Sequence, residues 1–257
     1  MTQLLLILKI ASMNKINGII TVRTTSSRLP RKCLLPFGDI NVIEHIIRRA
    51  KHFNIDPIIC TSTDSSDDIL VEIAKKENVK SFRGSLNNKL LRWYNCAEHF
   101  GLEYFHTVDA DDPFFDGTEM HRSLKTLITK DLDIVCPTQS SSNGGASVGY
   151  SLKTSVIKKA LIGLDNNTDT EMMWYYIDKV QGLNKFILEE RYENVTQVRL
   201  TLDYEEDYWL LKSIQNILGN LVSNSDIYNF LKINPEFYKI NWFRNLEWKD
   251  AQLAKKI

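Results

Sequence analysis

The sequence predicts an α/β fold, in which a central and mostly parallel sheet carries helices on both faces. Short apolar runs rich in β-branched residues alternate along the chain with stretches of helical periodicity, which is the pattern of successive βαβ units. The 257 residues are 43% hydrophobic and 25% charged, as is ordinary for a soluble globular protein. A chain of this length can bury a substantial core in one large domain or two small ones.

The first half of the chain shows this alternation most clearly. Residues 16–22, INGIITV, are β-branched and predict the first strand. The isoleucines of residues 41–53 recur at helical spacing, and paired aspartates at 67–68 are typical of a helix start. The expected elements are strand 16–22, helix 41–53, strand 57–61, helix 67–76, strand 79–82, helix 87–100, strand 104–108, helix 118–129 and strand 134–137.

The second half has a different character, because residues 139–149 form a polar, glycine-containing stretch that predicts a loop. A helix is expected at 171–180, and strands are expected at 186–190 and 195–202. Asp203 and Glu206 stand at capping-box spacing, so a helix is predicted over 204–218. The tail, which contains Trp242 and Trp248, predicts a packed helix and turn.

Charge and cysteine content exclude several classes of function. Thirty-two basic residues balance 32 acidic ones, so no global field attracts nucleic acid or an anionic membrane, and any polyanion site must be local. The four cysteines are too widely spaced to indicate a zinc site or a disulfide framework. The apolar run at residues 3–10 is too short for a membrane span and lacks the basic region of a signal peptide, so we expect a cytoplasmic protein.

A basic loop follows the first strand. It runs from residue 23 to residue 32 and carries four cationic side chains: Arg23, Arg28, Arg31 and Lys32. Guanidinium and ammonium groups can neutralise several phosphate charges, and the small hydroxyls of Ser26 and Ser27 let the backbone approach an anion. The loop therefore indicates a polyphosphate site, although a solvated basic loop would have the same composition.

Two acidic segments also follow predicted strands. Asp109, Asp111 and Asp112 come directly after strand 104–108, and ligands bind at the carboxyl ends of strands in open α/β sheets. Asp111 is the best candidate for a Mg²⁺ ligand, because Mg²⁺ prefers a few carboxylates together with phosphate oxygens. Asp203 ends the run RLTLD in the same way, and is interpreted as a helix N-cap, a metal ligand or both. Turn formation alone would also explain the Asp-Pro pair.

Four motifs in order make the chain resemble the cytidylyltransferase family, in particular its spore-coat polysaccharide branch, with CMP-Kdo and CMP-nonulosonate synthetases as relatives. The motifs are SSRLPxK at 26–32, FRGS at 82–85, DxP at 111–113 and LTxDxxED at 200–207. The resemblance covers roughly residues 16–215. It implies a Rossmann-like nucleotidyltransferase fold that uses CTP, Mg²⁺ and a small-molecule acceptor, for surface polysaccharide or glycoconjugate synthesis.

The resemblance also implies roles for individual residues. Arg23, Arg28 and Lys32 would grip the triphosphate together with Ser26 and Ser27, and Asp111 and Asp203 would hold the metal. Thr61 and Asp64 fall where relatives approach the base and ribose, and Arg83 is a further candidate for nucleotide contact. The expected site residues are therefore Arg23, Ser26, Ser27, Arg28, Lys32, Thr61, Asp64, Arg83, Asp111 and Asp203.

The chain departs from the family at three places. Arg31 and Ala110 stand where glycine is common, and EMMWYY at 171–176 replaces a glutamate–histidine pair that usually shapes the acceptor side. We expect residues 1–15 to be an N-terminal extension and 16–257 to be a single domain, with a dimerisation and acceptor-side insertion around 140–200. Because related synthetases are dimers, Trp174 and the tyrosines beside it are expected to anchor a homodimer contact.

Two other interpretations are compatible with parts of the sequence. Asp109-Ala110-Asp111 is also a DxD pattern, which is typical of metal-dependent glycosyltransferases. That interpretation leaves the basic loop unexplained, because a nucleoside diphosphate sugar donor needs no triphosphate grip at the first strand. A non-catalytic nucleotide-binding module of the same fold is the second alternative, and retention of both aspartates and all three expected cations argues against it.

Overall fold

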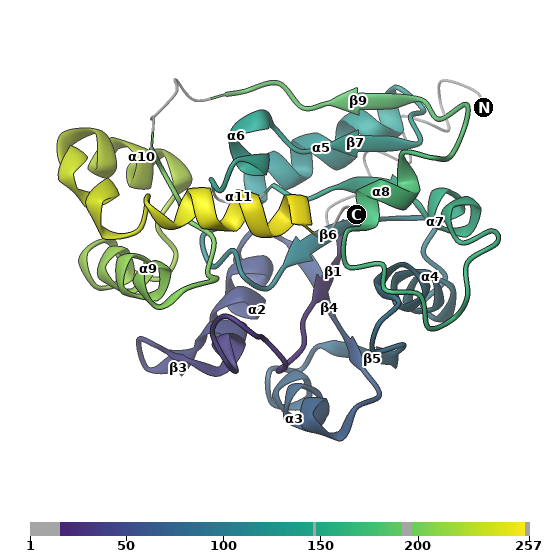
Figure 1. Ribbon diagram of the computed structural model, residues 1–257, viewed down its shortest axis with the longest axis horizontal. Coiled ribbons are helices and arrows are strands. Elements are labelled where there is room, and N and C mark those ends of the chain that lie inside the picture. Colours follow the sequence, from purple (N-terminus) through teal and green to yellow (C-terminus); the bar gives the residue numbers. More distant parts are fainter. Residues whose placement is uncertain (1–15, 146–147, 192–196, 255–257) are drawn as a thin grey trace.

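A sheet of seven strands forms the centre of the computed structural model, which describes residues 16–145, 148–191 and 197–254 (Figure 1). The predicted extension, residues 1–15, lies outside the described residues. In spatial order the strands are β5 (Lys80–Gly84), β4 (Ile55–Ser62), β1 (Ile16–Thr21), β6 (Tyr104–Asp109), β8 (Ser151–Lys153), β7 (Ile134–Cys136) and β9 (Lys185–Ile187).

The sheet is mostly parallel, as predicted. From β1 the chain proceeds outward to β4 and β5, and then returns to place β6 on the other side of β1. Only β8 runs antiparallel to its neighbours β6 and β7, and β9 pairs parallel to β7. The strand order reverses between β1 and β6, and this reversal is the topological switch point at which open α/β sheets bind ligands.

Helices cover both faces of the sheet, because successive strand residues point to opposite sides. Ile20 belongs to the core on one face and Ile19 to the core on the other, and both are fully buried. The first core packs against α2 (Val42–His52), α3 (Asp68–Lys76) and α5 (Gly117–Thr129). The second packs against α4 (Lys89–His99), α7 (Thr154–Ala160) and α8 (Met173–Ile177).

Polar side chains define where several helices begin. At α2, Asn41 accepts a hydrogen bond from the Glu44 amide at 2.9 Å and Glu44 accepts one from the Asn41 amide at 3.0 Å, which is a complete capping box. Asp116 accepts from two backbone amides at the start of α5. Short elements complete this half: η1 (Lys32–Leu34), β2 (Pro36–Phe37), β3 (Ile40–Asn41) and η2 (Ser65–Asp67).

Residues 205–254 form a helical group beside the sheet (Figure 1). It consists of α9 (Glu205–Leu218), α10 (Asn224–Ile233), η3 (Pro235–Ile240) and α11 (Arg244–Ala254). Leu211, Ile214 and Ile227 join α9 and α10 to the first core. In Figure 1, α11 extends from this group toward α8. The predicted helix at 204–218 and the helical tail are confirmed, whereas α10 was not predicted.

Several predicted elements between 139 and 202 are wrong in extent or type. The expected loop at 139–149 includes a short helix, α6 (Gln139–Ser142), and the expected helix at 171–180 is limited to α8. The predicted strand at 195–202 is not present over 197–202, and 195–196 lie outside the described residues. Isolated backbone hydrogen bonds to loops, Leu200 N to Gly144 O and Leu202 N to Asp111 O, replace a strand ladder there.

No helix in the described part of the chain is long and apolar enough to cross a membrane. The four cysteines are free thiols.

Candidate active site

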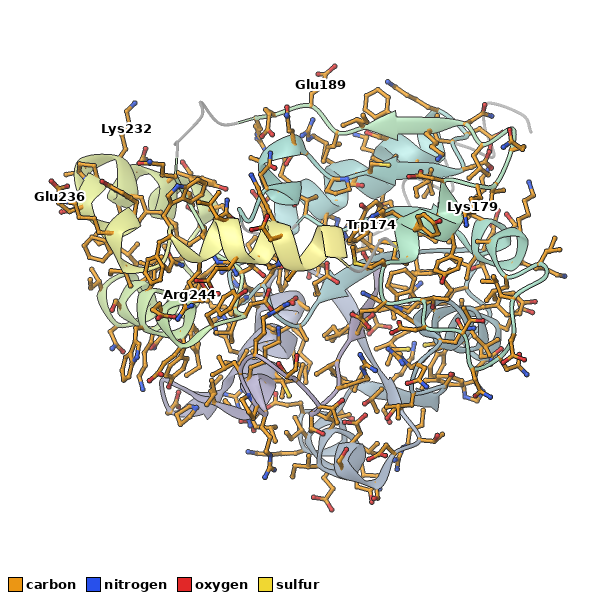
Figure 2. The ribbon with its side chains drawn as sticks, viewed as in Figure 1. Trp174, Lys179, Glu189, Lys232, Glu236 and Arg244 are labelled. Atoms are coloured by element: carbon orange, nitrogen blue, oxygen red, sulfur yellow. The ribbon has the colours of Figure 1, made fainter. Side chains whose placement is uncertain are left out.

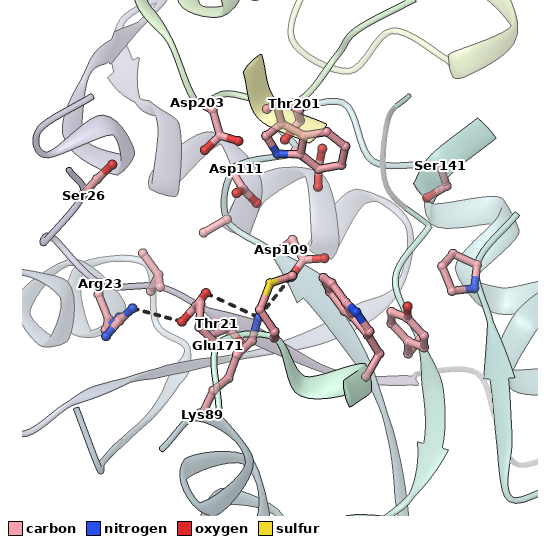
Figure 3. Close-up of a pocket in the computed structure, with 18 of the residues that line it drawn as sticks. Thr21, Arg23, Ser26, Lys89, Asp109, Asp111, Ser141, Glu171, Thr201 and Asp203 are labelled. Carbon is pink, nitrogen blue, oxygen red and sulfur yellow. Dashed lines mark hydrogen bonds and ion pairs between the residues drawn. The ribbon is translucent and has the colours of Figure 1, made fainter. Parts of the chain in front are cut away.

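A cavity of about 930 Å³ lies at the carboxyl ends of β1 and β6 (Figure 3). Thr21 and Asp109, the last residues of these two strands, are partners in the ladder and both line the cavity. The loop after β1 and the acidic segment after β6 therefore meet there. This position is the switch point of the sheet, so the topology and the cavity identify the same place.

Lys32 joins the two candidate metal-binding aspartates. Its Nζ lies 3.1 Å from Asp111 Oδ2 and 2.9 Å from Asp203 Oδ1, and it also donates to the Leu202 carbonyl at 2.7 Å. The Leu202 amide in turn donates to the Asp111 carbonyl at 2.7 Å. The structure thus brings together three of the predicted site residues, and Figure 3 shows Asp111 and Asp203 side by side.

This cluster is strongly coupled electrostatically. Burial by itself would lower the pKa of Lys32, but the carboxylates of Asp111 and Asp203 outweigh burial and raise the pKa well above its ordinary value. Burial would likewise raise the pKa of Asp203, whereas Lys32 and Arg28 lower it to about 2. Asp203 is therefore a carboxylate and Lys32 an ammonium ion at neutral pH.

A buried ion pair holds Asp203 in place. Arg199 Nε and Nη2 donate to the two oxygens of Asp207 at 2.8 and 2.9 Å, and both side chains are fully buried. Asp207 Oδ2 also accepts from the amides of Asp203 and Tyr204, at 2.9 and 3.0 Å. The predicted capping role of Asp203 with Glu206 is therefore wrong: Tyr204 is the N-cap of α9, Asp207 receives the capping hydrogen bonds, and the carboxylate of Asp203 is turned to cations.

Arg28 and Arg23 take different partners. Arg28 Nη2 lies 2.7 Å from Asp203 Oδ1, so Arg28 joins the Lys32 cluster. Arg23 instead donates to Glu171 Oε2 at 3.0 Å and to the Leu86 carbonyl at 2.7 Å. Both arginines line the cavity together with Ser26 and Ser27. One part of the basic loop is therefore directed at Asp203 through Arg28. The other is directed at Glu171 through Arg23, and Figure 3 shows this contact.

Arg31, the fourth cation of this loop, has a left-handed backbone conformation, with φ of +53°. Glycine adopts this conformation without the steric cost that a side chain brings, which explains why glycine suits this position. Arg31 is exposed and does not line the cavity.

Three predicted nucleotide-binding residues lie elsewhere. Thr61 is fully buried within β4, and Asp64 accepts a hydrogen bond from the Ser66 amide at the start of η2. Arg83 donates to the Ser62 carbonyl at 2.8 Å and pairs with Asp68 at 2.5 Å. None of the three is among the described residues that line the cavity.

Asp111 and Asp203 fit a shared divalent cation, because both carboxylates converge on one positively charged atom. Among the described residues, no group of three or more histidine, cysteine, aspartate or glutamate side chains is arranged to hold a metal. A two-carboxylate set completed by phosphate oxygens is the arrangement that Mg²⁺ favours. Asp112 also lines the cavity, and burial, followed by the neighbouring carboxylates of Asp111 and Asp109, raises its pKa above the ordinary value.

The sequence interpretation missed Lys89 and Glu171. Lys89 Nζ lies 4.0 Å from Asp109 Oδ1 and 3.9 Å from Glu171 Oε1, and it stands over the Trp93 ring at 5.1 Å. Glu171 thereby connects the segment before α8 to Arg23. This network corresponds to no short sequence motif. The position of Lys89, at the start of a helix that follows the FRGS motif, could have indicated a site residue.

The sequence profile described as cytidylyltransferase matches residues 17–238. The chain belongs to the cytidylyltransferase family. It is therefore a nucleotidyltransferase, and the match favours this interpretation over the glycosyltransferase and the non-catalytic module. Among curated relatives, the spore coat polysaccharide biosynthesis protein SpsF of Bacillus subtilis is 27% identical, and the match covers 87% of this chain and 97% of SpsF.

Solved structures share the fold of this cytidylyltransferase. A cytidylyltransferase from Leptospira borgpetersenii superposes with a TM-score of 0.75 at 23% identity, covering 88% of this chain and 97% of its own. CMP-2-keto-3-deoxy-manno-octonic acid synthetase in complex with CTP gives a TM-score of 0.60 at 12% identity, with 79% and 98% covered. A Mycobacterium tuberculosis protein solved with manganese gives 0.54 at 13% identity, with 77% and 98% covered.

Proposed function

We propose that this enzyme transfers CMP from CTP to a sugar or sugar-acid acceptor, with release of pyrophosphate, in the cytoplasmic synthesis of a surface polysaccharide or glycoconjugate. The convergence of Lys32, Asp111 and Asp203 on one point of the cavity carries the proposal. Family membership supports nucleotidyl transfer. The CTP complex of one structural relative and the name of SpsF support the choice of nucleotide and pathway.

The reaction requires charge stabilisation rather than a protein nucleophile. An acceptor oxygen attacks the α-phosphorus in line, and the bond from the α-phosphorus to the bridging oxygen breaks, so that its electron pair leaves with pyrophosphate. The proton of an acceptor hydroxyl passes to bulk water. Asp111 and Asp203 would hold a divalent cation, which we propose is Mg²⁺. When bound, this cation would neutralise phosphate charge. The manganese complex of one structural relative supports a divalent metal.

The cations of the basic loop would stabilise the leaving pyrophosphate. Arg28 and Lys32 adjoin Asp203, so a triphosphate that reaches the aspartates also comes within reach of both cations. Arg23 stands at the other end of the loop beside Glu171. Preorganised cations at the position where negative charge develops are an efficient source of rate enhancement. The proposal therefore keeps Arg23, Arg28, Lys32, Asp111 and Asp203 as the catalytic set.

Two measurements test the proposal. Titration calorimetry with each nucleoside triphosphate and Mg²⁺ should show that CTP binds most tightly. Pyrophosphate release should then occur with CTP and one member of a panel of sugar acids, sugar phosphates, neutral sugars and phosphonates, and should be lost in Asp111→Asn. Equal binding of all four triphosphates, or no pyrophosphate with any acceptor, would exclude the assigned reaction.

We also propose a homodimer whose contact uses the region after residue 140. Trp174 lines the cavity and is partly buried against the second core, so it is partly committed within one subunit. Tyr175 beside it is 44% exposed and is the better anchor on the surface. Light scattering over a dilution series tests this proposal, and a monomer with full activity would refute it.

A further inference from the structure

Helix α11 contributes to the cavity although it lies beyond the segment that the family profile matches. The profile ends at residue 238, and α11 begins at Arg244. Nevertheless Trp248 and Lys249 both line the cavity, together with Thr201 and Asp203 of the segment before α9. A part of the wall is therefore supplied by an element that the shared family pattern does not include.

Polar contacts anchor the first half of α11. Arg244 Nε and Nη2 donate to the two oxygens of Glu206 at 3.0 and 2.8 Å. Asn245 is 2% exposed and its Oδ1 accepts from Arg199 Nη1 at 3.4 Å. Arg199 also stands over the Trp248 ring at 5.6 Å. The buried arginine that holds Asp207, and through it Asp203, thus also supports α11.

Trp248 and Lys249 lie on different elements from the phosphate-binding loop. In Figure 2, α11 runs from Arg244 toward Trp174 of α8, and both tryptophans line the cavity. Two aromatic side chains from separate helices provide the apolar surface on which a sugar ring can rest. Neither tryptophan is among the residues that we assign to the triphosphate.

Lys249 adds a positive charge to this part of the wall. Lys32, Arg28, Lys89 and Lys185 of the cavity each have a carboxylate within 4.0 Å. Among the described residues Lys249 forms no such ion pair, and its side chain is exposed. An exposed, uncompensated ammonium group at the wall of a substrate cavity attracts an acidic group on a ligand.

We propose that α11 forms the acceptor-binding wall, with Trp248 packing against the acceptor ring and Lys249 pairing with an acidic group, a carboxylate or a phosphate, on that ring. This inference rests on the proposed function, because it assumes that the triphosphate occupies the basic loop. It assigns acceptor specificity to two residues outside the matched family segment.

The test compares three probes that share a pyranose ring: D-glucuronate, glucose 6-phosphate and D-glucose. Their binding to the full chain, saturated with CTP and Mg²⁺, is measured by ligand-observed NMR titration. We expect the two acids to bind about fivefold more tightly than glucose, as an exposed ion pair allows, and Lys249→Gln to remove that difference. Trp248→Leu should weaken all three by about tenfold, because the aromatic contact is common to them.

Matched controls are available in the same helical group. Lys239→Gln removes an exposed lysine of η3, and Trp209→Leu removes a tryptophan of α9 that is 53% exposed; neither lines the cavity, so neither should alter probe binding. Tighter binding of D-glucuronate identifies a carboxylate as the recognised group, and tighter binding of glucose 6-phosphate identifies a phosphate. Equal binding of acids and glucose, absence of binding by all three, or an acid preference that survives Lys249→Gln would overturn the inference.

Calorimetry with CTP separates this inference from the proposed function. If the proposed function fails, CTP does not bind the unmodified chain. If only the inference fails, CTP binds the unmodified chain and the Trp248→Leu and Lys249→Gln variants equally well, while the probes do not distinguish the variants.

Discussion

Lys32 Nζ lies 2.9 Å from Asp203 Oδ1, and the two residues are 171 positions apart in the chain. The contact joins the basic loop after β1 to the segment before α9, and Asp111 shares the same ammonium group. Removing one member of such a cluster leaves the others partly buried without compensation, so effects on activity and on stability have to be measured separately.

Asp111→Asn and Asp203→Asn should each lower turnover by at least about a hundredfold, because a neutral amide cannot replace a carboxylate in holding a divalent cation. Pyrophosphate release with CTP measures the effect. Circular dichroism should show a retained fold, and exposed Asp39→Asn serves as the control. Near-normal turnover in either variant would remove that aspartate from the proposed metal site.

Arg28→Ala and Lys32→Ala should weaken the binding of CTP more than that of CMP, since both cations are assigned to the departing pyrophosphate. Each lost charge-assisted hydrogen bond is worth about 1.5 to 3 kcal/mol. Titration calorimetry with the two nucleotides gives the comparison, with exposed Lys125→Ala as the control. Equal losses for CTP and CMP would place these side chains away from the β- and γ-phosphates.

Asp207→Asn should reduce the free energy of unfolding by about 3 to 5 kcal/mol, because it removes the carboxylate that accepts two hydrogen bonds from the fully buried Arg199 guanidinium. Urea denaturation measures the loss. Glu247→Gln interrupts the Arg244–Glu247 pair at the surface and should cost less than about 1 kcal/mol. If both substitutions cost the same, the Arg199–Asp207 pair does not have the structural role assigned to it.

Stability should fall as the pH drops from about 6.5 toward 4. Burial lowers the pKa of both His45 and His106 to about 4, whereas unfolded histidine titrates near 6.5. Between pH 4 and 6.5 the two histidines bind protons in the unfolded state but stay neutral in the native state. The stabilisation present above pH 6.5 is therefore lost on acidification, and the free energy of unfolding falls by up to about 2.7 kcal/mol per pH unit for two histidines.

Urea denaturation at pH 7, 6 and 5 tests this pH dependence. His106→Gln should flatten the curve, since its ring lies between Ser151 and the Val148 carbonyl inside the sheet. Exposed His52→Gln should leave the curve unchanged. Identical slopes for the unmodified chain and His106→Gln would show that other groups control acid stability.

Local pattern was sufficient for the alternation of strands and helices up to residue 136. Strand and helix periodicity are properties of short segments, and all nine elements expected before that residue are present within a few residues of their predicted bounds. The pattern failed between 139 and 202 for a physical reason. β8 and α8 are only three and five residues long. Residues 197–202 form no strand, and Leu200 and Leu202 make single backbone hydrogen bonds to distant loops instead.

The sequence by itself determined the α/β class, the order of the elements up to residue 136, and the motifs that place Arg28, Lys32 and Asp111 after strand ends, because each of these depends on neighbours in the chain. Only the tertiary structure decided their partners. Arg23 meets Glu171 across 148 positions, and α11 reaches the cavity through Arg199 and Glu206. Such pairings follow from how the strands and helices pack against one another, and a contact between distant segments has no periodicity that the sequence could display.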